Sequence, residues 1–166
     1  TANLRVNEWM AQPARGDDWF EIYNNDPLPV NISGLWLSDT PGTPKITQIP
    51  PLSYIAEGGY ADLVADGTTE GGNHVNFKLS AGGDFIILSS GSTTLDSLAI
   101  TSGGANVSRG RLPDGGATLA SFPLTESRGD SNWLETAVVI NELRVHSQDS
   151  GDAVELYNTS GGSVDI

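Results

Sequence analysis

Two stretches of this chain repeat one another. Residues 4–32 align with residues 138–166 without a gap, at a constant offset of 134. Each copy carries an Asn-Glu pair followed, at the same spacing, by a Glu-x-Tyr-Asn element. These residues are Asn7, Glu8 and Glu21 to Asn24 in the first copy, and Asn141, Glu142 and Glu155 to Asn158 in the second. A repeat of this length predicts units of about one small domain each, because each unit has to bury its own apolar face.

The second copy stops at Ile166, whereas the first continues into a further apolar stretch, residues 33–39. We therefore expect residues 1–133 to form a complete domain, residues 134–137 a linker, and residues 138–166 only the first strands of a second unit. A fragment of that size does not bury its apolar side chains alone. We expect it to be frayed, to pack on the first unit, or to form a strand-exchanged homodimer through residues 138–166.

Short strands separated by glycine-rich turns account for most of the chain. The composition includes 20 glycines and 37% hydrophobic residues, and no long segment has the apolar spacing of a helix. The segments with strand-like sequences are residues 4–10, 19–23, 30–32, 35–37, 45–49, 60–65, 75–79, 85–88, 94–100 and 107–112. About nine strands at a spacing of roughly 8–12 residues predict an all-β fold, an antiparallel β-sandwich.

The charge balance bears on possible partners. The formal net charge is −13, and the chain has no cysteine. A surface with this charge repels phosphate backbones and anionic membranes, so we expect no nucleic-acid binding. No apolar run is long enough to cross a bilayer, and we expect no membrane insertion. Without cysteine, disulfides and thiolate metal sites are excluded.

Seven short motifs follow one another in order between residues 4 and 133. They are Val6-Asn7-Glu8, residues 19–24, residues 30–39, Gly58-Gly59-Tyr60, residues 76–84, Leu95-Asp96-Ser97 and residues 108–115. In this order they resemble the lamin tail domain family. The resemblance implies an immunoglobulin-like β-sandwich and an accessory module of large exported bacterial proteins. It therefore implies an extracellular, periplasmic or cell-surface location, and it carries over no catalytic residue.

Glu8 and Glu21 are the most distinctive polar residues of the repeat. Paired carboxylates can serve acid–base chemistry or bind a cation. A carboxylate that accepts hydrogen bonds from backbone N–H groups at a bend would serve the fold equally well. We favour the structural interpretation, because buried acids are often structural and both residues recur together with the strand pattern.

Acidic loops raise the possibility of a Ca²⁺ site. The candidate ligands are Asp17, Asp18, Asp62 and Asp66. None has the Asp-x-Asp-x-Asp-Gly spacing of a Ca²⁺ loop. The sequence therefore predicts no cofactor, with Ca²⁺ kept as an alternative.

Interaction motifs form a third group of candidates. Arg15-Gly16-Asp17 and Arg128-Gly129-Asp130 match an adhesion tripeptide that is also ordinary loop composition. Trp9 alternates away from Leu4 and Val6, so we expect it to face outward, where it could contact a sugar. Trp19 and Trp36 lie in apolar strands, and we expect both in the core.

The sequence gives little support for a hydrolytic enzyme. Within residues 1–133 the only histidine is His74, in a glycine-rich turn, where we expect it to be exposed. A zinc site with several histidines is unavailable there, and no Gly-x-Ser-x-Gly motif occurs. We therefore predict a non-enzymatic accessory or interaction module that contacts neighbouring domains or other proteins. The alternative is a module that binds carbohydrate or a cell surface, assisted by Ca²⁺.

Overall fold

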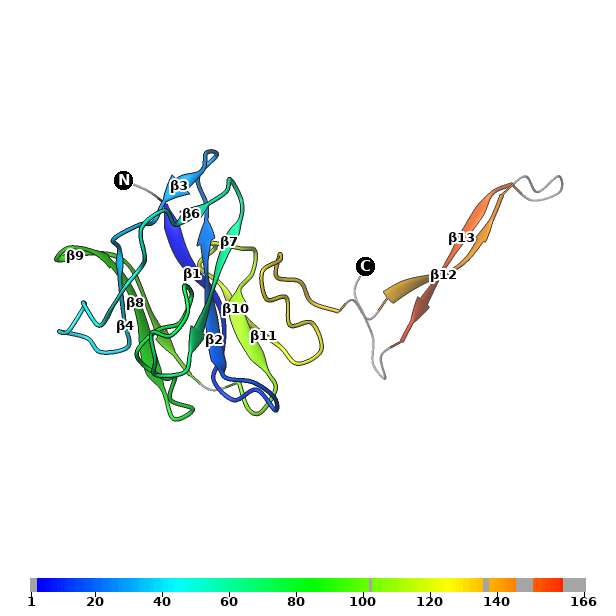
Figure 1. Ribbon diagram of the computed structural model, residues 1–166. Helices are drawn as coiled ribbons and strands as arrows, with labels where there is room; N and C mark the ends of the chain where they lie inside the picture. The colour runs from blue at the N-terminus through cyan, green and yellow to red at the C-terminus, as the bar shows by residue number, and fades with distance from the viewer. Residues whose placement is uncertain (1–2, 102, 136–137, 146–150, 160–166) are drawn as a thin grey trace. The chain divides into compact units, whose positions relative to one another are not determined.

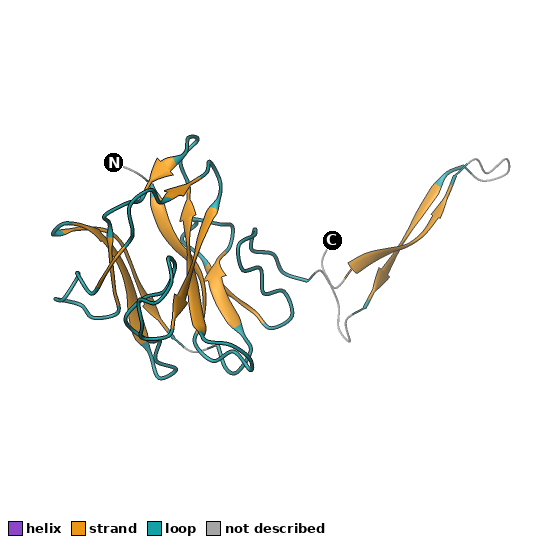
Figure 2. Cartoon of the chain, in the orientation of Figure 1, coloured by secondary structure: helices purple, strands orange, loops and turns teal. Residues whose placement is uncertain are grey.

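The computed structural model describes residues 3–101, 103–135, 138–145 and 151–159. Its contacts divide the chain into two compact units, Thr1–Trp133 and Leu134–Ile166, and each is considered by itself (Figure 1). Of the predicted linker, residues 134–137, and the predicted partial repeat, residues 138–166, some positions lie outside the described residues. Strands and loops account for all the described residues, and no helix is present among them (Figure 2).

The first unit contains two main sheets. The five-stranded sheet has the order β11-β10-β1-β2-β7, and the four-stranded sheet has the order β5-β4-β8-β9. A short third pair joins β3 to β6. The strands are β1 (Leu4–Met10), β2 (Asp18–Asn24), β3 (Val30–Asn31), β4 (Trp36–Ser38), β5 (Thr47–Gln48), β6 (Tyr54–Ile55), β7 (Tyr60–Ala65), β8 (Asp84–Ser90), β9 (Thr93–Ile100), β10 (Ser108–Arg111) and β11 (Leu119–Phe122). All pairings between these strands are antiparallel.

The hydrophobic core joins apolar residues of both main sheets. Val6, Phe20 and Ile22 from β1 and β2 belong to one buried cluster with Ile86 and Leu88 from β8. The two sheets therefore pack as the layers of a β-sandwich, as Figure 1 shows (β8 and β9 on one side, β1, β2 and β10 on the other). The predicted all-β antiparallel sandwich is confirmed.

A β-bulge in β1 changes which side chains face the core. In the pairing of β1 with β2, Val6 lies opposite Ile22, but Trp9 lies opposite Phe20, so two residues of β1 face one of β2. Strict alternation is thereby interrupted at Asn7 and Glu8. The core face of β1 consequently carries Leu4, Val6 and Trp9.

Two of the strand predictions need correction. Residues 75–79 form no regular strand: Lys78 makes an isolated bridge with Asp66, and His74, just before this stretch, makes one with Val64. They nevertheless bury Val75, Phe77 and Leu79, and this burial accounts for their alternating sequence. The structure also has β6 and β11, which the sequence did not predict, so the described residues of the first unit form eleven strands rather than about nine.

The second unit is a hairpin of β12 (Val138–Arg144) and β13 (Ala153–Asn158). Its register reproduces that of β1 and β2 at the repeat offset. Ile140 lies opposite Leu156 and Leu143 opposite Val154, with an irregularity between Ile140 and Glu142. The irregularity falls at the position of the bulge in β1, so the two hairpins share their backbone pairing as well as their sequence pattern.

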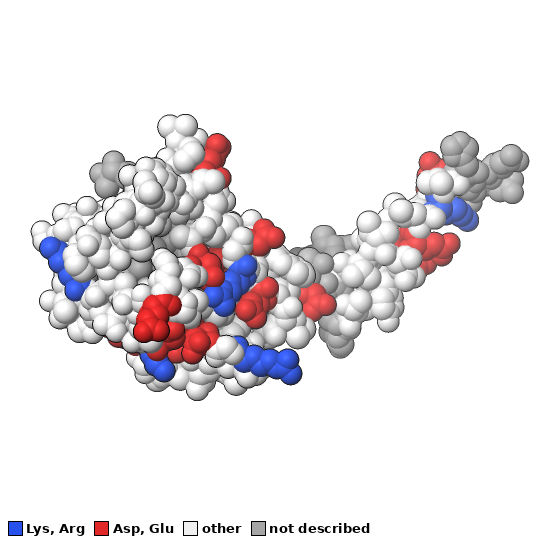
Figure 3. Space-filling model, in the orientation of Figure 1, with Lys and Arg blue, Asp and Glu red and all other residues white. Residues whose placement is uncertain are grey.

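Acidic side chains outnumber basic ones on the face of the molecule seen in Figure 3, in keeping with the net charge of −13. Among the residues with described structure, no helix has the length and apolar character to cross a membrane.

Candidate functional site

A cluster of buried polar residues lies on the face of the five-stranded sheet that points away from the core. The bulge in β1 turns Asn7 and Glu8 toward this face, and alternation along β2 places Glu21 beside them. All three side chains are fully buried. They are covered by residues 123–133, which follow β11 and are called the closing segment below. The sheet thus has a core on one face and a polar layer on the other.

Glu21 joins β1 to the closing segment. Its Oε1 accepts a hydrogen bond from Asn7 Nδ2 at 2.9 Å, and its Oε2 accepts one from the backbone N–H of Gly129 at 2.8 Å. Burial raises the pKa of the Glu21 carboxyl to about 8, and these two hydrogen bonds act in the opposite direction. Both oxygens therefore have donors supplied by the chain itself.

Glu8 holds the closing segment through Ser127. Its Oε1 accepts a hydrogen bond from the Ser127 backbone N–H at 3.4 Å. Its Oε2 lies 3.1 Å from Ser127 Oγ, which in turn lies 2.7 Å from Asn132 Oδ1. Asn132 Nδ2 donates to the carbonyl oxygen of Arg111, which fixes the amide orientation.

The Ser127 hydroxyl lies between two acceptors. It is within hydrogen-bond distance of both Glu8 Oε2 and Asn132 Oδ1, and its single proton can be donated to only one of them at a time. Burial raises the pKa of the Glu8 carboxyl, and the hydrogen bonds from Ser127 act in the opposite direction.

Asp114, in the turn after β10, completes the cluster. Its Oδ1 accepts hydrogen bonds from Asn7 Nδ2 at 2.9 Å and from the Asn132 backbone N–H at 3.1 Å. Its Oδ2 accepts one from the Tyr60 hydroxyl at 2.8 Å. Burial raises the pKa of Tyr60, and the hydrogen bond to the Asp114 carboxylate raises it further, so the phenol stays protonated as the donor.

Outside the cluster, Arg128 fastens the closing segment to the sheet. Its guanidinium makes a two-point contact with the Asp62 carboxylate, at 2.7 and 2.9 Å. It also lies 5.2 Å from the centre of the Trp19 ring, a cation–π distance. Trp19 is buried, as expected, but beneath the closing segment rather than in the main core cluster.

Burial and hydrogen bonding limit the part that Glu8 and Glu21 can take in acid–base catalysis. The carboxylates of Glu8 and Glu21 are inaccessible, and their oxygens are engaged by Asn7, Ser127 and Gly129. A catalytic acid has to reach its substrate, which these two cannot do without displacement of the closing segment. The geometry therefore favours the structural interpretation of the pair over acid–base work.

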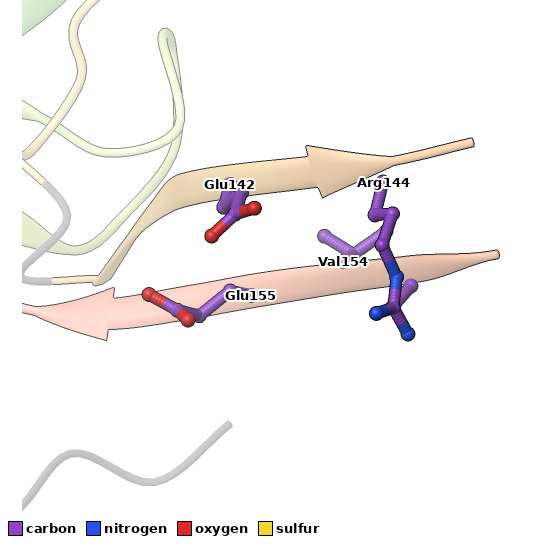
Figure 4. Close-up of a pocket in the computed structure, with 5 residues that line it drawn as sticks. Glu142, Arg144, Val154 and Glu155 are labelled. Carbon is purple, nitrogen blue, oxygen red and sulfur yellow. The ribbon is translucent and has the colours of Figure 1, made fainter. Parts of the chain in front are cut away.

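The described residues of the second hairpin include the counterparts of Asn7, Glu8 and Glu21, namely Asn141, Glu142 and Glu155. Asn141 Nδ2 donates to Glu155 Oε1, as Asn7 does to Glu21. Glu142 and Glu155 are exposed, and with Arg144, Ala153 and Val154 they line a shallow hollow of about 290 Å³. Figure 4 shows the two carboxylates on facing strands, close to one another.

Two of the predicted Ca²⁺ ligands, Asp62 and Asp66, contact nitrogen-bearing side chains. Asp62 is engaged by Arg128, and Asp66 Oδ2 lies 2.7 Å from His74 Nδ1. Asp17 and Asp18 lie together in a shallow pocket that Lys78 also lines. The described part of the chain contains no group of three or more His, Cys, Asp or Glu residues that could hold a metal ion.

Trp9 was expected to face outward, and this prediction is wrong. Its side chain is 1% exposed and belongs to the core cluster, because the bulge at Asn7 and Glu8 reverses the alternation of β1. It therefore cannot stack on a sugar at the surface. Trp36 was expected in the core, but it is only partly buried, with Lys45 Nζ 5.9 Å from its ring centre.

The two Arg-Gly-Asp sequences have different surroundings. Arg15, Gly16 and Asp17 lie in an exposed loop between β1 and β2. In the second sequence, Arg128 contacts Asp62 and Trp19, and Gly129 donates its N–H to Glu21. In the second Arg-Gly-Asp, Gly129 thus contacts the polar cluster and Arg128 holds the closing segment on the sheet.

Three members of the cluster escaped the sequence analysis as site residues. Asp114 lies within the motif at residues 108–115, where no role was assigned to it from the sequence, and Ser127 and Asn132 lie in a stretch without a strand pattern. The partners of Ser127 and Asp114 in β1 are more than a hundred positions away in the chain, and no local sequence pattern predicts such a contact.

Comparison with known proteins supports the assignment of family. The model of the lamin tail domain matches residues 1–102, more than half of the chain. Neither the curated proteins nor the solved structures yield a significant match. The matched residues include β1 to β9 and the Asn-Glu and Glu-x-Tyr-Asn elements of the first repeat. The chain therefore belongs to the lamin tail domain family, whose fold is an immunoglobulin-like β-sandwich.

Proposed function

We propose that the chain is a non-catalytic accessory module of a larger exported protein, a β-sandwich that docks or spaces neighbouring domains. The observation that supports this proposal is that the buried acidic cluster makes its hydrogen bonds within the chain itself. The carboxyl groups of Glu8, Glu21 and Asp114 accept hydrogen bonds from backbone N–H groups of the closing segment. These acidic residues therefore stabilise the module instead of acting on a substrate. Membership of a family that is generally non-enzymatic supports the same conclusion.

A docking module needs a firm scaffold with exposed surface groups. The closing segment ties residues near the end of the first unit to β1, β2 and β7 through Glu8, Glu21 and the Asp62–Arg128 pair. Such cross-links between distant parts of the chain resist local opening. The net charge of −13 keeps a module of this kind soluble at a cell surface.

Lysine cross-linking on intact producing cells tests both parts of the proposal. The lysines of the chain, Lys45 and Lys78, are exposed on the sandwich. A membrane-impermeant amine cross-linker should join one of them to a neighbouring domain or another surface protein. Lys45→Arg and Lys78→Arg serve as matched controls, since each removes one reactive amine and keeps the charge.

The outcome separates the alternatives. Cross-linked peptides that contain Lys45 or Lys78, recovered from intact cells, would support an exported docking module. Labelling that occurs only after lysis would contradict exposure at the cell surface. Labelling on intact cells without any link to another domain or protein would contradict docking.

A further inference from the structure

The arginines of the two Arg-Gly-Asp sequences line the same pocket of the first unit. Arg15 lies in the loop between β1 and β2 and Arg128 in the closing segment, and both border a hollow of about 290 Å³. The lining contains these two guanidinium groups and one carboxylate, that of Glu126, so it is positively charged on a chain whose formal net charge is −13. The pocket therefore attracts an anionic group more strongly than the surrounding surface does.

Both guanidinium groups have N–H groups left for a ligand. Arg15 is exposed and has no hydrogen-bond or ion-pair partner among the described residues. Arg128 uses Nε and Nη2 for Asp62, at 2.7 and 2.9 Å, and this pair leaves the N–H groups of Nη1 unused. The other described arginines of the first unit have protein partners: Arg5 and Arg111 contact Asp96, and Arg109 contacts Thr101. Arg15 differs from them because all its donors remain available.

The backbone that carries Arg15 is fixed by Asn106, which also lines the pocket. The backbone N–H of Ala14 donates to Asn106 Oδ1, and the backbone N–H of Asn106 donates to the carbonyl oxygen of Gln12 at 2.9 Å. Asn106 has a φ of 59°, in the left-handed region that asparagine adopts more readily than most residues. The loop is thus tied down directly before Arg15, and a fixed backbone lowers the entropy lost when a ligand binds.

The lining of the pocket indicates the chemistry of its ligand. Guanidinium groups with free N–H donors match a carboxylate, which accepts hydrogen bonds from arginine in pairs. Met10, Pro13 and Ala14 also line the pocket and can contact an aliphatic stem that carries the carboxylate. Trp19 is only 1% exposed and lies under the guanidinium group of Arg128, so the pocket offers no aromatic face to a sugar ring. These features favour an acidic amino-acid side chain over an acidic sugar.

We propose that this pocket binds the side-chain carboxylate of a glutamate on a partner protein, with Arg15 and Arg128 as the hydrogen-bond donors. Glu126 competes with the incoming carboxylate for the same guanidinium groups, so its charge limits the affinity. The inference rests on the proposed docking function, for which it names the chemistry of one contact. Binding of a small carboxylate to the purified chain can fail while cross-linking to a neighbour on cells succeeds, so the two failures are distinguishable.

Titration of the full chain with N-acetyl-glutamic acid α-amide, followed by NMR, is the test. The side-chain carboxyl is the only ionisable group of this probe, and N-acetyl-glutamine α-amide is its uncharged equivalent. We expect saturable shifts of the Nε–H resonances of Arg15 and Arg128 with the first compound and none with the second. Arg15→Gln should raise the dissociation constant at least ~5-fold, because it removes a charged donor. Arg144→Gln is the matched control: it removes the same charge from an exposed arginine of the second unit and should leave binding unchanged.

Glu126→Gln gives an independent readout, since removal of the competing carboxylate should lower the dissociation constant of the probe. A chain whose resonances show no saturable shift would overturn the proposal. So would equal binding of the uncharged glutamine derivative, or a loss of affinity that is the same in Arg15→Gln and Arg144→Gln, because the attraction would then be a general effect of charge. Tighter binding of glucuronate than of the glutamate derivative would contradict the assignment to a protein carboxylate.

Discussion

Glu21 is the residue whose ionisation is most directly coupled to the stability of the sandwich. Burial raises its pKa to about 8 in the folded chain, against an ordinary value of 4.5. Between these values the folded chain holds a proton that the unfolded chain has released. The stabilisation linked to this carboxyl is therefore complete below about pH 4.5 and is lost as the pH rises to about 8. Its slope is at most ~1.4 kcal/mol per pH unit.

Urea unfolding between about pH 5 and pH 8 measures this dependence. In Glu21→Gln we expect a flatter pH profile and a lower free energy of unfolding near pH 5, because the amide nitrogen cannot accept the Gly129 N–H. Glu155→Gln is the matched control: it stands at the same register in β13, is exposed, and should keep the pH profile of the unsubstituted chain. A Glu21→Gln profile as steep as that of the unsubstituted chain would exclude Glu21 as the source.

Trp9 illustrates why single side chains could be misplaced from the sequence. Strict alternation from Leu4 and Val6 puts it at the surface, but the bulge adds a residue and returns it to the core. The second copy contained a signal for this. Its apolar residues Ile140 and Leu143 are three positions apart, which regular alternation does not produce.

At the scale of elements, β10 is constrained by how closely it passes beneath the closing segment. A Cβ on Gly110 would lie 2.6 Å from the Asn7 carbonyl oxygen and 2.7 Å from Asn132 Nδ2. Gly110→Ala should therefore lower the free energy of unfolding by about 1–3 kcal/mol, since both neighbours have to move.

Gly72→Ala is the control for this substitution, because a Cβ there would meet nothing within 4 Å. Chemical unfolding measures the free energy of unfolding of both variants, one at a position with close neighbours and one at a position without them. Equal stabilities would contradict the close packing of β10 against β1 and the closing segment.

Regular strands were the part of the fold that the sequence predicted well. The long strands β1, β2, β7, β8 and β9 all follow from their apolar patterns. Residues 75–79 had such a pattern too, yet they form no ladder of backbone hydrogen bonds. An alternation of apolar and polar residues indicates that one side of the segment is buried, and it does not indicate that the backbone pairs with another strand. The closing segment has no pattern of its own, since its place depends on carboxylates in β1 and β2 that are distant in sequence.

At the scale of the whole molecule, the chain carries one set of polar residues in two environments. In the first unit Asn7, Glu8 and Glu21 are buried and hold the closing segment. In the second unit the corresponding Glu142 and Glu155 are exposed on a hairpin. The repeat was visible in the sequence, but the contrast between the two environments was not, because burial in the first unit depends on the closing segment, which is distant in sequence from β1 and β2.

This contrast allows a direct measurement within one molecule. Carbodiimide coupling of a small amine to the native chain, followed by mass spectrometry, reports how readily each carboxyl group reacts. We predict that Glu142 and Glu155 are modified many-fold faster than Glu8 and Glu21, because buried groups react only from opened states. In denaturant, all four should react at similar rates. If Glu8 and Glu21 reacted in the native chain as fast as Glu142 and Glu155, they would be accessible to ligands, and their structural role beneath the closing segment would be refuted.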